Sequence, residues 1–88
     1  MNDKVIIIAL DDWEVIYFEG KKFAEGHEVS DIEFIRLGML MEEAEISIGE
    51  IIDIYIGNND VSEESILWNW DDNIDNLHDE VKNLIVEK

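Results

Sequence analysis

The side chains that could carry chemistry are mostly carboxylates, and the densest run is DDNIDN at Asp71–Asn76. Its first, third and fifth positions match the start of an EF-hand calcium loop. The sixth position of that loop needs glycine but is Asn76, and the twelfth needs glutamate but is Lys82. The EF-hand interpretation therefore fails. A weak divalent-cation site among these acids is the minor alternative, and we expect no resident metal and no cofactor.

The histidines and serines form no recognisable catalytic motif. No serine lies in a Gly-x-Ser-x-Gly turn, and His27 and His78 lack the two further strong ligands of a zinc site. Cysteine is absent, which excludes disulfides and thiol nucleophiles. Asp53 is the best candidate for a buried general acid, but strand alternation favours an outward position for it. We therefore expect no catalytic residues and a protein that is not an enzyme.

Charge is the strongest overall property of the chain. Among 88 residues, 23 are acidic and 6 are Lys or Arg, giving a net charge of -17, while 47% are hydrophobic, which is enough to fold. This balance argues against direct binding to nucleic-acid phosphates or to an anionic membrane. The apolar runs are too short to span a bilayer and no signal peptide is recognisable, so we expect a cytoplasmic protein.

The length predicts a single domain, residues 1–88, that begins with strands. Val5–Leu10 is apolar at both odd and even positions, which is typical of a central strand covered on both faces. Trp13–Glu19 resumes after an acidic turn, so the two segments predict an antiparallel hairpin. Gly20 suits a second tight turn, after which Phe23-Ala24 can add a short edge strand.

Two helices and one more strand are predicted in the rest of the chain. Ser30 and Glu33 have the spacing of a capping box, so a helix should begin there, with an apolar face that extends to Ala44. Glu50–Ile56 is strongly β-forming. Beyond it, a stripe with spacings of three and four residues predicts one amphipathic helix. The stripe comprises Leu67, Trp70, Ile74, Leu77, Val81 and Leu84. The weak helix formers of Asp71–Asn76 could kink this helix or split it in two.

The predicted order is strand, strand, short strand, helix, strand, helix. This order indicates a small α+β domain in which an antiparallel sheet, built from a hairpin and a further strand, is packed by two helices on one face.

The polar side of the predicted last helix carries an acidic row with one tryptophan. The row comprises Glu63, Glu64, Trp68, Asp71, Asp72, Asp75, Asp79 and Glu80. Carboxylates at helical spacing repel one another, so such a row is unfavourable unless solubility or a basic partner compensates. An exposed tryptophan is typical of an energetic anchor in a protein interface. These eight residues are therefore the predicted partner-binding face. If Trp68 belongs to the core instead, the alternative surface is the acidic turn at Asp11, Asp12 and Glu14.

One part of the chain resembles known sequences. WEVIYFEGK at Trp13–Lys21, followed by GHEVS at Gly26–Ser30, resembles a pattern in small uncharacterised proteins of phages and bacteria. The size and acidity of the chain are similar to those of phage-encoded inhibitors that imitate DNA, such as anti-restriction and anti-CRISPR proteins. This resemblance implies an acidic inhibitor that docks on a basic, nucleic-acid-binding protein in the host cytoplasm. The alternative is a small cytosolic interaction or structural domain, or a homodimer formed through the isoleucine-rich strand or the last helix, whose acidity serves only solubility.

Overall fold

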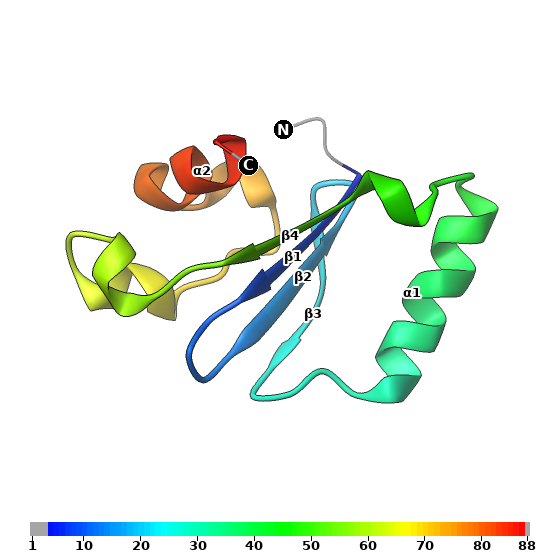
Figure 1. The fold of residues 1–88 in the computed structure, drawn as a ribbon, viewed down its shortest axis with the longest axis horizontal. Coiled ribbons are helices and arrows are strands. Elements are labelled where there is room, and N and C mark those ends of the chain that lie inside the picture. Colours follow the sequence, from blue (N-terminus) through cyan, green and yellow to red (C-terminus); the bar gives the residue numbers. More distant parts are fainter. Residues whose placement is uncertain (1–3, 88) are drawn as a thin grey trace.

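The computed structural model describes residues 4–87, which form a mixed four-stranded sheet and two α-helices (Figure 1). The elements are β1 (Val5–Ala9), β2 (Glu14–Phe18), β3 (Lys21–Gly26), α1 (Asp31–Glu43), β4 (Ile51–Tyr55) and α2 (Asp79–Val86). The predicted α+β class and the predicted order of elements are confirmed.

The predicted hairpin is present. β1 and β2 pair antiparallel with Ile7 opposite Ile16, and β2 pairs antiparallel with β3. The turn between β2 and β3 places Glu19 and Gly20 at positive φ, 49° and 85°, which a tight two-residue turn requires and which glycine adopts without strain. The third strand is longer than the predicted Phe23-Ala24.

The fourth strand corrects the predicted sheet. β4 pairs parallel with β1, with Val5 opposite Ile51, so the strand order is β3-β2-β1-β4 and the sheet is not purely antiparallel. Parallel neighbours need a long crossover, and residues 27–50, which include the 13-residue helix α1, supply it. The sequence pattern identifies β4 as a strand but does not specify the end of the sheet at which it begins.

Both faces of the sheet are covered, as the apolar pattern of β1 predicts. Ile6 and Ile8 belong to one buried cluster and Val5 belongs to the other, with the partly buried Ile7 packed against it. The expectation that the helices share one face is wrong, because α1 lies on one side of the sheet and the chain beyond β4, including α2, lies on the other (Figure 1). The apolar side chains at both odd and even positions of β1 already require this arrangement, because a strand that is apolar on both faces must be covered on both sides.

α1 begins as predicted but is apolar on two sides. The Ser30 hydroxyl accepts a hydrogen bond from the Glu33 backbone N–H at 3.3 Å. Only Leu37 and Met41 are buried on this helix. A second stripe spaced three and four residues apart is exposed to solvent: Ile32 by 68%, Ile35 by 63% and Met39 by 61%.

The predicted helix after residue 60 is not continuous: it is interrupted within the weak helix formers of Asp71–Asn76, the alternative that the sequence leaves open, and its apolar stripe still reaches the core. The chain forms a 3-10 helix at Glu64–Trp68 and another at Ile74–Asn76, and α2 begins only at Asp79. The stripe residues Leu67, Trp70, Ile74, Leu77 and Val81 are buried, and Leu84 is partly buried.

Local hydrogen bonds explain why this segment does not form a continuous helix. The Asp71 carboxylate accepts from the Asn73 N–H at 2.8 Å, and the Asn73 side chain accepts from the Asp75 N–H at 3.0 Å. His78 Nδ1 likewise accepts from the Glu80 N–H at 3.1 Å and so caps α2. Short polar side chains that bind nearby N–H groups compete directly with helical hydrogen bonds.

Candidate partner-binding cleft

A cleft of about 360 Å³ opens where the β1–β2 turn meets β3 and the chain after β4. It is lined by Leu10, Asp11, Asp12, Trp13, Glu25, Asn58, Glu64, Leu67, Trp68 and Trp70. The lining thus contains all three tryptophans of the chain and four carboxylates, and no Lys, Arg or His. Its chemistry is aromatic and acidic.

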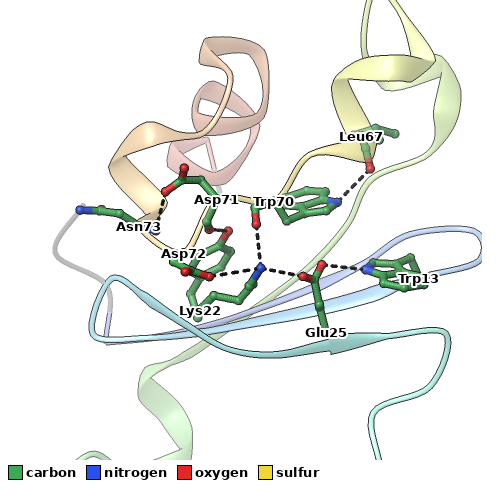
Figure 2. Close-up of polar contacts among 9 residues, drawn as sticks. Trp13, Lys22, Glu25, Leu67, Trp70, Asp71, Asp72 and Asn73 are labelled. Atoms are coloured by element: carbon green, nitrogen blue, oxygen red, sulfur yellow. Dashed lines mark hydrogen bonds and ion pairs between the residues drawn. The ribbon is translucent and has the colours of Figure 1, made fainter.

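Lys22 on β3 fixes the wall formed by Trp70 (Figure 2). Its Nζ donates to Glu25 Oε1 at 2.6 Å and to the Trp70 carbonyl at 2.9 Å, and it lies 3.3 Å from Asp72 Oδ1. The Lys22 backbone N–H also donates to the Asp72 carbonyl at 2.7 Å. The Lys22 side chain is only 19% exposed. The hydrogen bond with Glu25, and more weakly the one with Asp72, raises the pKa of Lys22, so its charge is firmly held.

Glu25 connects this network to Trp13, which forms another wall of the cleft. Its Oε2 accepts from Trp13 Nε1 at 3.1 Å, so one carboxylate connects Lys22 to Trp13 (Figure 2). The Trp13 ring also meets His27 edge-on, with 4.8 Å between ring centroids and a 75° interplanar angle. His27 Nδ1 lies 3.0 Å from the carbonyl oxygen of Asp12, which anchors the turn beside the cleft. Trp13 is therefore held by contacts on two sides.

Trp68 and Trp70 are close in sequence but differ in exposure. Trp70 is 6% exposed and its Nε1 donates to the Leu67 carbonyl at 2.9 Å (Figure 2). Trp68 is 72% exposed. The sequence predicts this difference in exposure because the two residues would lie on opposite faces of one helix. In the structure the difference has another origin: Trp68 ends the 3-10 helix at Glu64–Trp68, and the extended residue Asn69 separates it from Trp70.

Tyr17 of β2 also contacts the segment that follows Trp70. Its hydroxyl donates to the Asp71 carbonyl at 2.6 Å. Burial, together with the negative charges of Glu25, Asp71 and Asp72, raises the pKa of Tyr17 well above its ordinary value. The phenol therefore remains a neutral hydrogen-bond donor at any physiological pH.

The eight residues of the predicted acidic row do not lie on one continuous helix. Glu64 and Trp68 line the cleft. Glu63 and Asp71 line a separate shallow pocket that contains no tryptophan. Asp75 is exposed on the 3-10 helix at Ile74–Asn76.

The three remaining acids of that row, Asp72, Asp79 and Glu80, contact other described residues. Asp72 pairs with Lys22, and Asp79 lies 3.6 Å from Lys82 Nζ. Glu80 accepts from the Ser62 backbone N–H at 2.8 Å and from the Ser62 hydroxyl at 2.6 Å. Of the eight predicted partner-binding residues, the structure therefore places Glu64 and Trp68 in the lining of the cleft.

The remaining cleft residues come from the β1–β2 turn, from β3 and from the chain after β4, which contributes Asn58, Leu67 and Trp70. Asp11 and Asp12 belong to the alternative acidic turn, whereas the third member, Glu14, accepts from the Val29 N–H at 3.1 Å and lies outside the cleft lining. Sequence reasoning misses Trp13 and Glu25. The feature that could have identified them is the register of the hairpin formed by β2 and β3. This register pairs Val15 with Glu25 and so places Glu25 beside the start of β2.

Comparisons with protein-family models, with curated proteins and with solved structures give no match for this chain. Within residues 4–87, no helix is both long enough and apolar enough to cross a membrane. The same residues contain no group of three or more His, Asp or Glu side chains placed to hold a metal ion. The cleft is therefore interpreted from its own chemistry.

The contrast between the two tryptophans can be tested by substitution. Trp70→Ala should lower the free energy of unfolding by about 3–5 kcal/mol, because a buried indole is replaced by a cavity. Trp68→Ala should change it by less than about 0.5 kcal/mol, because most of that side chain already faces water. Urea denaturation followed by circular dichroism measures both. Equal destabilisation by the two changes would contradict the exposed position of Trp68.

The contact between Glu80 and Ser62 predicts a pH-dependent effect. Hydrogen bonds from the Ser62 hydroxyl and N–H hold the pKa of Glu80 below its ordinary value of 4.5. A carboxyl group with a lowered folded-state pKa stabilises the fold above its unfolded pKa, and this contribution disappears as the pH falls through the folded-state value. Glu80→Gln should therefore lower the Tm at about pH 7, and the difference from wild type should shrink toward about pH 3.

Glu28→Gln is the matched control for this measurement, because it removes an exposed carboxylate that lacks these hydrogen bonds. A Glu80→Gln difference that stays constant from neutral to acidic pH would show that Glu80 does not stabilise the fold through its charge.

Proposed function

We propose that this chain is a non-enzymatic acidic binding protein that docks on a basic, nucleic-acid-binding protein and inhibits it by imitating nucleic-acid charge. The observation that carries the proposal is the exposed indole of Trp68 in the same cleft as the carboxylates of Asp11, Asp12 and Glu64. Tryptophan is enriched among residues that dominate binding energy, and a net charge of -17 accelerates association with a basic surface. The partner would be met in the host cytoplasm.

The distribution of cations supports a protein partner over nucleic acid itself. Residues 4–87 contain five Lys and Arg side chains, and four of them lie within 4.0 Å of a carboxylate: Lys4, Lys22, Arg36 and Lys82. Phosphate binding needs several cations gathered on one surface. We therefore expect no shift of duplex DNA by this protein in a gel at about 150 mM salt.

Affinity capture from a lysate tests the proposal. Immobilised protein should retain a basic, nucleic-acid-binding protein at about 50 mM salt and lose it at about 500 mM, where charges are screened over roughly 4 Å. Added duplex DNA should displace the captured protein, because both would occupy one groove. Trp68→Ala should weaken capture, since truncation of such an anchor typically costs at least about 2 kcal/mol of binding energy. Capture that is insensitive to both salt and DNA would contradict charge mimicry.

Two triple variants with the same charge change separate the cleft from general acidity. Reversing Asp11, Asp12 and Glu64 to lysine should abolish capture. The matched control reverses Glu42, Glu43 and Glu45, three exposed acids at the end of α1 on the other side of the sheet. This control should retain most of the captured protein. Equal loss in both variants would mean that net charge, not the cleft, determines binding.

The exposed stripe of α1 favours the second candidate function, a homodimer. Ile32, Ile35 and Met39 have the spacing with which helices anchor in apolar grooves. Sedimentation at increasing concentration should then show a dimer that Ile35→Glu abolishes. Ile48→Glu is the control, because Ile48 is also exposed but lies outside α1, in the 3-10 helix at Ile48–Glu50. A monomer at every concentration would exclude a homodimer formed through α1.

A further inference from the structure

We infer that the cleft is a binding site for the guanidinium group of an arginine side chain presented by a protein partner. The inference deepens the proposed function and rests on it for the source of the arginine. The site itself is argued from the lining residues alone.

The aromatic part of the lining suits a cation. Indole rings attract cations electrostatically more strongly than other aromatic side chains do, because their faces carry partial negative charge. Trp13, Trp68 and Trp70 all line the cleft, and Trp68 is largely open to solvent. Trp13 is already positioned by its hydrogen bond to Glu25, so this wall is formed before any ligand arrives.

The acidic part of the lining argues against anionic and apolar ligands. Asp11, Asp12, Glu25 and Glu64 contribute four carboxylates. The Lys22 ammonium neutralises one of them, Glu25, and is itself occupied by three oxygen partners. An anionic ligand would be repelled by the remaining three acids. A neutral apolar ligand would desolvate carboxylates without compensating their charge.

Two of these carboxylates make no contact that offsets their charge. The Asp11 carboxylate accepts a hydrogen bond from the Tyr55 hydroxyl, which is a neutral donor and leaves the negative charge in place. No hydrogen bond or ion pair joins the Glu64 carboxylate to the rest of residues 4–87. Both oxygens of Glu64 therefore remain available to a ligand.

Size and shape favour arginine over lysine. A volume of about 360 Å³ falls at the lower end of the range for small-ligand sites. A guanidinium group is planar, stacks on aromatic rings and donates to a carboxylate through two parallel N–H groups. An ammonium is a compact and strongly hydrated charge that does neither equally well.

Titration with capped amino acids tests the site directly. The probes are N-acetylarginine amide, N-acetyllysine amide and N-acetylcitrulline amide, the last being a neutral analogue of arginine with nearly the same shape. The readout is the indole N–H resonances in the proton–nitrogen correlation spectrum, assigned by single Trp→Phe variants. The Trp13 resonance reports on Glu25, to which it donates, and the Trp70 resonance reports on the buried wall, where its N–H is bonded to the Leu67 carbonyl.

The arginine probe should shift the Trp13 and Trp68 resonances saturably and bind about tenfold more tightly than the citrulline probe, with lysine between them. Glu64→Gln should weaken arginine binding several-fold, because it removes a carboxylate from the cleft. Glu63→Gln is the matched control: it makes the same charge change one residue away and outside the cleft lining, so it should leave binding unchanged.

Equal binding of arginine and citrulline, absence of any saturable shift, or equal effects of the Glu63 and Glu64 variants would overturn the assignment. Its failure is distinguishable from failure of the proposed function. Capture of a basic protein without arginine binding would overturn the cleft assignment alone. Arginine binding without any captured basic protein would support the cleft assignment and overturn the proposed function.

Discussion

The Lys22 side chain is the polar contact that joins the segment around Trp70 and Asp72 to the sheet. Its ammonium joins Glu25 on the same strand to the Trp70 carbonyl and the Asp72 carboxylate, about fifty residues further along the chain. Ile74 adds a backbone hydrogen bond to the Gly20 carbonyl at 2.9 Å. In a chain with so many acids, one low-exposure cation can hold several segments at once. The same contact attaches the chain after β4 to the sheet and fixes two walls of the cleft.

The parts of the fold that are predictable from the sequence depend on short-range patterns. The apolar positions of β1 predict two covered faces, and Ser30 with Glu33 predicts the start of α1. The last third shows where such patterns fail. A spacing of three and four residues identifies which residues reach the core, but successive turns joined by extended residues can satisfy it as well as a helix can. The side-chain hydrogen bonds of Asp71 and Asn73 favour the turns over a continuous helix.

The candidate site is less predictable, because it is assembled from distant segments. Composition predicts an acidic surface, and the sequence offers an exposed Trp68 as one of two alternatives, of which the structure shows the exposed one. The cleft also needs Trp13 and Glu25, which reach it only through the pairing of β2 with β3 and through the attachment of the last third by Lys22. Neither contact can be inferred from the spacing of apolar residues along the chain. The parallel pairing of β4 escapes sequence analysis for the same reason, since it depends on the path of residues 27–50.

The acids of this chain differ in what they do for the fold, and that difference bears on function. Asp72 forms an ion pair with Lys22, and Glu80 accepts hydrogen bonds from Ser62, so both carboxylates have contacts within the fold. Glu64 makes no such contact within residues 4–87, yet it shares a cleft with three tryptophans. Solubility explains acids spread over a surface, but it does not explain an exposed indole among them, since Trp68 works against solubility. A ligand that is both cationic and able to stack on an aromatic ring accounts for the two features together.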